Sequence, residues 1–166
     1  ATTGGIITKE AVLSKLTDDT ALVCVMAVNN ETGAIQPVYE IAKAITEHSK
    51  GRRRPKFHVD CVQAAGKIPL KLENSGIDSA AFSAHKIGGL RGIGLLYLDF
   101  PVEPFLRGGG QEKGIRSGTE NILGAAVISL CLELYFISDK NSKSYARFEL
   151  QKKYTDDFVK SLGTLP

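Results

Sequence analysis

The sequence predicts an α/β protein with three layers, in which a mixed, mostly parallel sheet lies between helices. Apolar segments rich in β-branched residues alternate along the chain with segments that have the periodicity of amphipathic helices. This alternation is typical of a parallel sheet covered by helices. The chain has 166 residues, of which 43% are hydrophobic and 23% are charged. That composition suits a globular protein with a sizeable core.

The first half of the chain contains two predicted helices and two predicted strands. Residues 8–16 form a short amphipathic helix, and residues 37–49 form a second helix that Pro37 opens. The continuous apolar run at residues 21–28 predicts a strand buried on both faces. A short strand at residues 57–60 follows and ends in an acid.

The second half begins with a small apolar strand that ends at Ser83. Residues 92–98 form another buried strand, and the short connection before it predicts that the two strands run antiparallel. We expect Thr119 to cap a long apolar helix that reaches about residue 137. A more amphipathic helix is predicted over residues 144–162.

Composition argues against several classes of function. The net charge of +3 is too small to indicate a nucleic-acid partner, and the basic run at residues 50–56 is typical of a solvated loop. No apolar run has the length of a membrane span, and no secretory signal opens the chain. The three cysteines lack metal-binding spacing. We therefore expect a cytoplasmic protein without a metal, a membrane or a nucleic acid as partner.

Polar side chains follow three of the predicted strands. Asn30 follows the first, Asp60 ends the second, and Ser83, His85 and Lys86 follow the third. Parallel strands of one sheet end at the same edge, where α/β proteins bind their ligands. The sequence therefore predicts a site at this edge.

A lysine at a buried edge suits Schiff-base chemistry, because desolvation lowers its pKa and frees its lone pair. Asp60 could hold the protonated ring nitrogen of pyridoxal phosphate, while Ser83, His85 and Thr119 could donate to its phosphate. Two alternatives have weaker support. A metal at Asp60 lacks a second ligand at suitable spacing, and a hydrolase triad lacks a nucleophile elbow.

Four ordered motifs then carry a resemblance to a known family. They are VNNETGAIQP, HVDCVQAAGKIPL, SAHKIGGLRGIGLLYL and RGGGQEKGIRSGTEN, at residues 28–37, 58–70, 83–98 and 107–121. In their order and spacing the chain resembles the cysteine desulfurases (NifS/IscS-like), which are class V aminotransferase-type enzymes of fold type I. The resemblance implies pyridoxal 5′-phosphate as cofactor and part of the family's large domain as the fold.

The resemblance implies specific roles around the cofactor ring. Lys86 resembles the lysine that binds the cofactor covalently as a Schiff base and moves protons at the substrate's Cα. Asp60 resembles the partner of the ring nitrogen, and Gln63 resembles the donor to the ring's phenolic oxygen. Asn30 resembles the residue beside that oxygen and the substrate carboxylate. Without the resemblance, Gln63 and Asn30 would be interpreted as residues that tether loops.

The phosphate has its own set of implied ligands. Ser83 and His85 resemble phosphate ligands of the same subunit. Thr119 resembles the contact supplied by the other subunit of a homodimer, so residues 107–121 are expected to reach across that interface.

The implied reaction converts L-cysteine to L-alanine and leaves the sulfur as a persulfide on an enzyme cysteine. The sulfur then passes to an acceptor protein such as an iron–sulfur scaffold, or to other thiol-dependent pathways. None of Cys24, Cys61 and Cys131 aligns with the family's catalytic cysteine, and Cys24 and Cys131 lie in apolar segments that predict inert core residues.

We therefore expect a central fragment that does not turn over alone. Residues 1–139 would be the central part of the cofactor-binding large domain, and residues 140–166 a helix leading toward an incomplete small domain. Alternatives are a selenocysteine lyase or another class V enzyme and, in a different class, a non-catalytic segment for dimerisation or partner binding.

Overall fold

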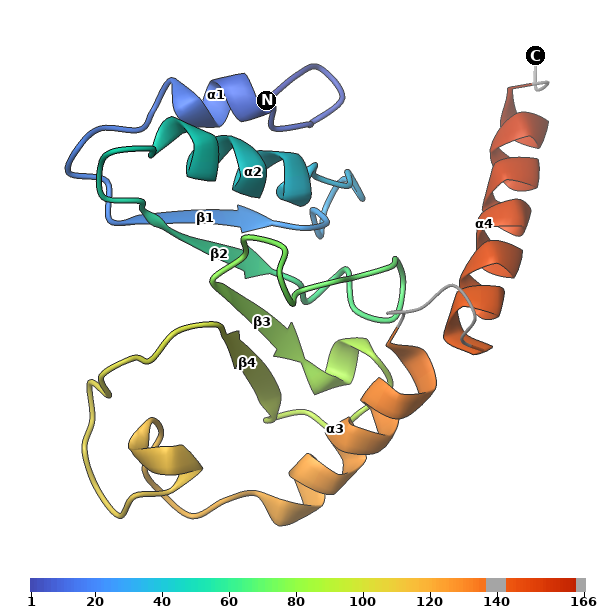
Figure 1. Cartoon of the computed structure of the whole chain (residues 1–166). Helices are drawn as coiled ribbons and strands as arrows, with labels where there is room; N and C mark the ends of the chain where they lie inside the picture. Colours follow the sequence, from blue (N-terminus) through green and yellow to red (C-terminus); the bar gives the residue numbers. More distant parts are fainter. Residues whose placement is uncertain (137–142, 164–166) are drawn as a thin grey trace.

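A four-stranded mixed sheet forms the centre of the computed structural model, which describes residues 1–136 and 143–163 (Figure 1). Its strands lie side by side in the order of the chain: β1 (Leu22–Met26), β2 (Lys56–Asp60), β3 (Ser79–Ser83) and β4 (Gly94–Leu98). The first three strands are parallel, and β4 is antiparallel to β3. The α/β class, the mixed and mostly parallel sheet, and the antiparallel direction of β4 are therefore confirmed.

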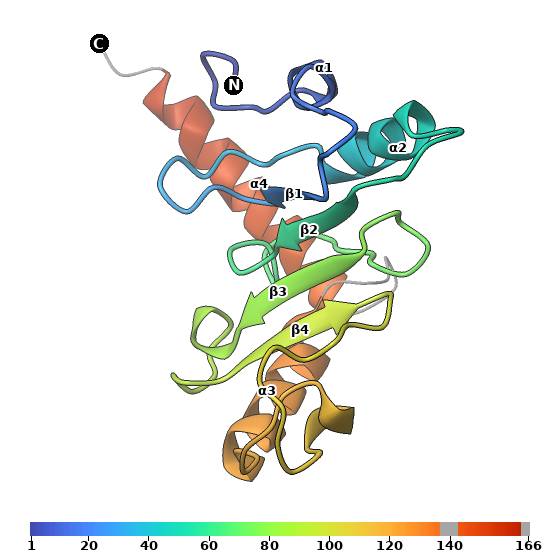
Figure 2. The ribbon, with the colours of Figure 1, turned by 90° about the vertical axis from the view of Figure 1, so that its left-hand side faces the viewer.

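Four α-helices accompany the sheet in the described part of the chain: α1 (Lys9–Leu13), α2 (Val38–His48), α3 (Ile122–Tyr135) and α4 (Lys143–Leu162). Two short 3₁₀ turns lie between these elements: η1 (Ala84–Lys86) comes directly after β3, and η2 (Glu112–Gly114) lies between β4 and α3. In Figure 2 the strands lie between α1 and α2 at the top and α3 at the bottom. The predicted domain division between residues 139 and 140 falls outside the described residues.

The core gathers on one face of the sheet. Side chains alternate along β2, so Phe57 and Val59 point to the same face, and both are fully buried. Ile41 and Ile45 of α2, one helical turn apart, belong to the same hydrophobic cluster and are equally buried. Each such side chain contributes roughly 1.5–3 kcal/mol on leaving water, so this contact fixes α2 over the strands.

The opposite face of the sheet is more open, and two sequence predictions are wrong there. β1 was expected to be buried on both faces, but Leu22 is 55% exposed and Cys24 is exposed. β4 was expected to be buried, but Leu96 is 56% exposed. The cause is that β1 and β4 are the two edge strands of this sheet, and these three residues lie on the face away from the core cluster.

The start of α3 also differs from the prediction. The side-chain oxygen of Asn121, and not that of Thr119, accepts a hydrogen bond from the backbone N–H of Gly124 at 2.9 Å. Asparagine at an N-cap satisfies one of the free N–H groups of the first turn. Farther along, the ring of Phe136 meets Phe82 of β3 edge to face, with centroids 6.2 Å apart. This ring contact joins the end of α3 to the sheet.

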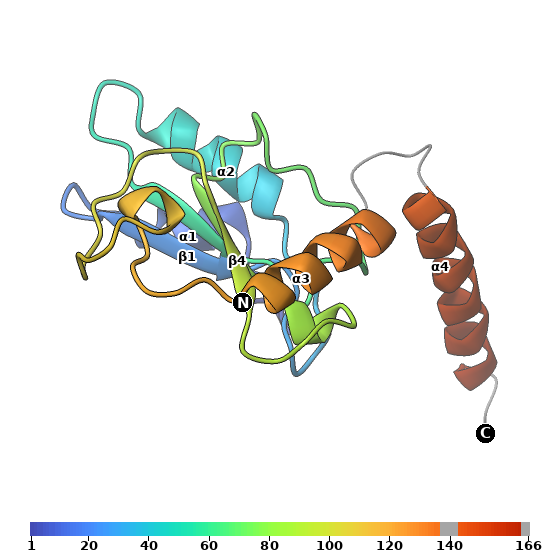
Figure 3. The same cartoon turned by 90° about the horizontal axis from the view of Figure 1, so that it is seen from below.

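α4 projects away from the sheet in both Figure 1 and Figure 3. Ser144 Oγ and the guanidinium of Arg147 both donate to the backbone oxygen of Leu134, and these bonds join its first turn to the end of α3. Beyond that turn the helix is exposed, including the aromatic side chains of Tyr154 and Phe158.

Candidate functional site

Three parallel strands present their carboxyl ends at one edge of the sheet. Asp60 is the last residue of β2 and pairs with Ala81 of β3 in the register, so Ser83 ends β3 two positions farther on. The η1 turn follows at once and carries His85 and Lys86. The structure thus brings Asp60, Ser83, His85 and Lys86 to neighbouring strand ends.

The turn that carries Lys86 is closed by backbone hydrogen bonds to one carbonyl. The N–H groups of Ile87 and Gly89 donate to Ala84 O at 3.0 and 2.8 Å. A Cβ on Gly89 would lie only 2.9 Å from the Cβ of Ala84, and Gly88 has a φ of +84°. The glycines after Lys86 are therefore what allows the chain to fold back tightly beneath it.

Lys86 is exposed in the part of the chain that the structure describes. The expectation that this lysine lies at a buried edge is therefore wrong there. The buried member of the turn is Ala84, while His85 and Lys86 lie beyond the end of the sheet. Lys86 is thus accessible to a ligand that settles on this edge.

Ser83 and His85 form a direct pair. Ser83 Oγ lies 2.9 Å from His85 Nδ1, a hydrogen-bond distance across two residues of the chain. Hydroxyl and imidazole groups can both donate hydrogen bonds to an anion. One group uses its proton within the pair, and the other can donate to a phosphate just before Lys86 in the chain.

Asp60 is fixed by its own chain. The backbone N–H of Val62 donates to Asp60 Oδ1 at 2.9 Å, so one carboxylate oxygen anchors the turn after β2. The neighbouring Cys61 is fully buried, and burial together with the negative charge of Asp60 raises the pKa of its thiol to about 12. Asp60 thus has the fixed carboxylate that a protonated ring nitrogen requires, and Cys61 is a thiol at neutral pH.

A lysine that the sequence analysis missed belongs to this group. Lys67 Nζ donates to Gln63 Oε1 at 2.7 Å. Partial burial and then the positive charge of Lys86 lower the pKa of Lys67, so the two ammonium groups are close enough to interact. The i, i+4 spacing of Gln63 and Lys67 was the signal in the sequence, although residues 64–70 show no clear periodicity.

Asn30 and Thr119 are not joined to this group by hydrogen bonds among the described residues. The loop after β1 is held by Asn29, whose side-chain oxygen accepts from the N–H groups of Glu31 and Thr32 at 2.9 and 2.8 Å. Asn30 is exposed beside it. Thr119 is exposed in the segment before α3.

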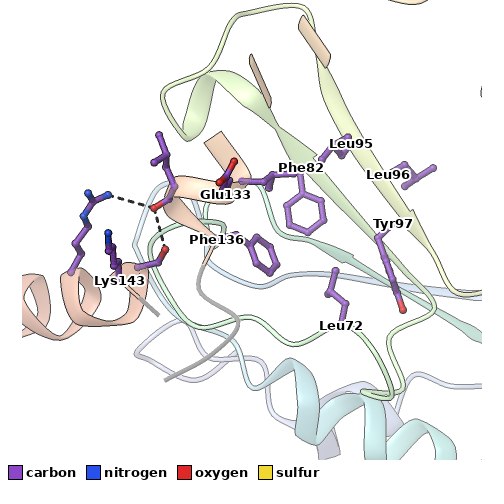
Figure 4. A pocket seen from close by; sticks show the side chains of 12 residues that line it. Leu72, Phe82, Leu95, Leu96, Tyr97, Glu133, Phe136 and Lys143 are labelled. Carbon is purple, nitrogen blue, oxygen red and sulfur yellow. Dashed lines mark hydrogen bonds between the residues drawn. The ribbon is translucent and has the colours of Figure 1, made fainter. Parts of the chain in front are cut away.

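A separate apolar pocket lies between β3, β4 and the end of α3 (Figure 4). It has a volume of about 730 Å³, and its apolar lining includes Leu72, Phe82, Leu96, Tyr97 and Phe136. None of the predicted site residues lines it. Its walls suit apolar side chains better than a phosphorylated cofactor.

The described residues contain no group of three or more histidine, cysteine, aspartate or glutamate side chains placed to hold a metal ion. Within the same residues, every helix is too short or too polar to cross a membrane.

Comparison with known proteins identifies the family. Residues 1–163 match the family model of class V aminotransferases, and the chain belongs to this family. It is 47% identical over 126 residues to a cysteine desulfurase of Nostoc sp., covering 75% of this chain and 30% of that protein.

Solved structures give the same result. A NifS-like protein from Rickettsia africae superimposes with a TM-score of 0.76 at 36% identity, covering 98% of this chain and 44% of the other. A structure described as SspA in complex with cysteine gives a TM-score of 0.72 at 28% identity, with coverages of 90% and 43%. The chain spans well under half the length of these relatives.

Enzymes of this family depend on pyridoxal phosphate. The chemistry of the residues at the sheet edge fits that cofactor. A primary amine is available for its aldehyde, a fixed carboxylate for its ring nitrogen, and a hydroxyl–imidazole pair for its phosphate.

Proposed function

We propose that this chain is the central part of the cofactor-binding large domain of a cysteine desulfurase. The observation that carries the proposal is the placement of Lys86 directly after the Ser83–His85 pair, at the strand end next to Asp60. An amine, a hydroxyl–imidazole pair and a carboxylate thereby meet at one edge of a parallel sheet. The identity to cysteine desulfurases over most of the chain supports the substrate class.

Each residue has a defined task in this proposal. When bound, pyridoxal phosphate would withdraw electrons from the substrate's Cα. The Lys86 amine would hold the cofactor covalently and, once displaced by substrate, carry a proton to and from the Cα. Asp60 would keep the ring nitrogen protonated, and Ser83 with His85 would bind the phosphate.

The remaining predicted residues complete the surroundings. Gln63 would donate to the phenolic oxygen of the ring, and Asn30 would lie beside that oxygen and the substrate carboxylate. Thr119 would contact the phosphate of the partner subunit in a homodimer. The exposure of Asn30 and Thr119 leaves both available for contacts of this kind.

The proposed reaction takes the sulfur of L-cysteine to an enzyme thiol as a persulfide and releases L-alanine. The sulfur would then pass to an acceptor such as an iron–sulfur scaffold. Cys61 and Cys131 are buried, so we assign the accepting thiol to neither of them.

The lysine assignment is tested in the full-length protein by the visible absorption band of bound pyridoxal phosphate. We expect Lys86→Ala to abolish this band, whereas Lys43→Ala, on an exposed lysine of α2, leaves it unchanged. An unchanged band in Lys86→Ala would refute the assignment. Assay of alanine and sulfide from cysteine, against selenide from selenocysteine, separates a desulfurase from a selenocysteine lyase.

A further inference from the structure

The side chains of Lys67 and Gln63 are in direct contact. The segment after β2 is a run of turns, in which Ala65 N–H donates to Cys61 O. Gly66 has a φ of +71°, so this segment is not a regular helix. Within it, Lys67 Nζ lies 2.7 Å from Gln63 Oε1.

The chemistry of this contact fixes the orientation of an amide. The ammonium of Lys67 is only a donor, so the atom of Gln63 that it meets must be the oxygen. The NH₂ group of Gln63 therefore points away from Lys67. Without Lys67, the two orientations of the amide, which have almost the same shape, would compete.

The pair lies next to Lys86. A Cβ on Gly66, which lies between Gln63 and Lys67 in the chain, would be 3.5 Å from Ile87 Cγ2, so this segment packs against the residue that follows Lys86. Partial burial and then the positive charge of Lys86 lower the pKa of Lys67, which agrees with this proximity. Gln63 is partly buried, as is Asp60, whereas Lys67 is exposed. The order from solvent inward is thus Lys67 and then Gln63.

We propose that Lys67 is a positioning residue, which holds the oxygen of Gln63 and so keeps its NH₂ group directed as a donor toward the phenolic oxygen of the bound cofactor. The inference rests on the function proposed above and deepens it. Lys67 acts only through Gln63 and touches neither cofactor nor substrate. Its loss would thus weaken one hydrogen bond that stabilises the deprotonated oxygen.

The test is a pH titration of the cofactor's visible absorption in the full-length holoenzyme. We expect Lys67→Met to raise the pH midpoint of the spectral transition by about half to one pH unit, the shift that corresponds to one ordinary hydrogen bond. Lys67→Arg keeps a donor and should hold the midpoint near that of the wild type. Lys71→Met, on an exposed lysine four residues farther along the chain, should leave the midpoint unchanged.

A double-mutant cycle distinguishes an effect of Lys67 on the orientation of the Gln63 amide from a direct effect of the Lys67 charge on the cofactor. If Lys67 acts through the amide, Lys67→Met should shift the midpoint much less in a Gln63→Ala background than in the wild type. An equal shift in both backgrounds would reduce Lys67 to a nearby charge, and no shift in either would overturn the proposal. A wild-type protein that binds no pyridoxal phosphate would refute the proposed function itself, which is a different outcome.

Discussion

Asp78 and Arg54 form an ion pair that joins the segment before β2 to the segment before β3. The same carboxylate also accepts a hydrogen bond from Lys56 Nζ at 3.0 Å and from the backbone N–H of Phe57 at 2.8 Å. Asp78 is only 8% exposed. This cluster fixes the beginnings of the two strands whose ends carry the proposed site.

Removal of this carboxylate should therefore destabilise the protein. We expect Asp78→Ala to lower the free energy of unfolding by about 3 kcal/mol, because it leaves a partly buried guanidinium and a buried N–H without their acceptor. Denaturant titration measures the change. Asp18→Ala, which breaks the exposed pair with Arg52, is the matched control and should change stability by less than about 0.5 kcal/mol.

The pH dependence of stability provides a second test of Asp78. Burial alone would raise its pKa, but the hydrogen bonds from Arg54, Phe57 N–H and Lys56 outweigh burial and hold the pKa below the ordinary 3.8. The folded pKa is thus depressed, so the contribution is complete above about pH 4 and is lost as the pH falls through the folded value. The stability difference between wild type and Asp78→Asn should shrink over that range. A stability difference that stays constant down to pH 2 would contradict a lowered pKa of Asp78 in the folded protein.

The cap of α3 predicts a contrast between two nearby residues. Asn121→Ala removes the acceptor for the Gly124 N–H and should cost about 1 kcal/mol of unfolding free energy. Thr119→Ala should leave stability almost unchanged, since its side chain does not cap the helix. Equal losses of unfolding free energy in the two variants would instead support Thr119 as a capping residue, as the sequence predicted.

That contrast illustrates what a sequence pattern can and cannot locate. Alternating apolar and amphipathic segments were sufficient to predict all four strands and the direction of β4, because they report burial and connection length. The same pattern could not distinguish Thr119 from Asn121 as the cap, since both residue types favour that position. Nor could it show that β1 and β4 are the edge strands, which leaves Cys24 and Leu96 exposed.

The candidate site also has one part that the sequence could predict and one part that it could not. The order of strands predicted that Asp60, Ser83, His85 and Lys86 would meet, because parallel strands end at one edge. The bond between Lys67 and Gln63 depends on how a short turn winds, which composition does not specify. The roles taken from the family resemblance, the homodimer and the cytoplasmic location stay predictions.

The turn after Lys86 should not tolerate a methyl group. In Gly89→Ala the new Cβ would lie 2.9 Å from Ala84 Cβ and 3.0 Å from Ala84 O, so the turn would have to open. We expect the affinity of the full-length protein for pyridoxal phosphate to fall at least tenfold, measured by equilibrium titration of the apoenzyme. Gly4→Ala, where the added methyl meets only Thr2 at 3.9 Å, should leave the affinity unchanged.

Cys61 lies beside Asp60, yet its surroundings argue against a role as sulfur acceptor. A nucleophilic cysteine reacts as the thiolate, and with a pKa of about 12 the thiolate fraction of Cys61 at neutral pH is negligible. Its side chain is also fully buried in the core cluster. We expect iodoacetamide to label Cys61 only after denaturation, as peptide mass mapping would show. We also expect Cys61→Ala in the full-length protein to keep its desulfurase activity. Loss of sulfur transfer in Cys61→Ala, with pyridoxal phosphate binding and the free energy of unfolding intact, would instead assign the accepting thiol to this position.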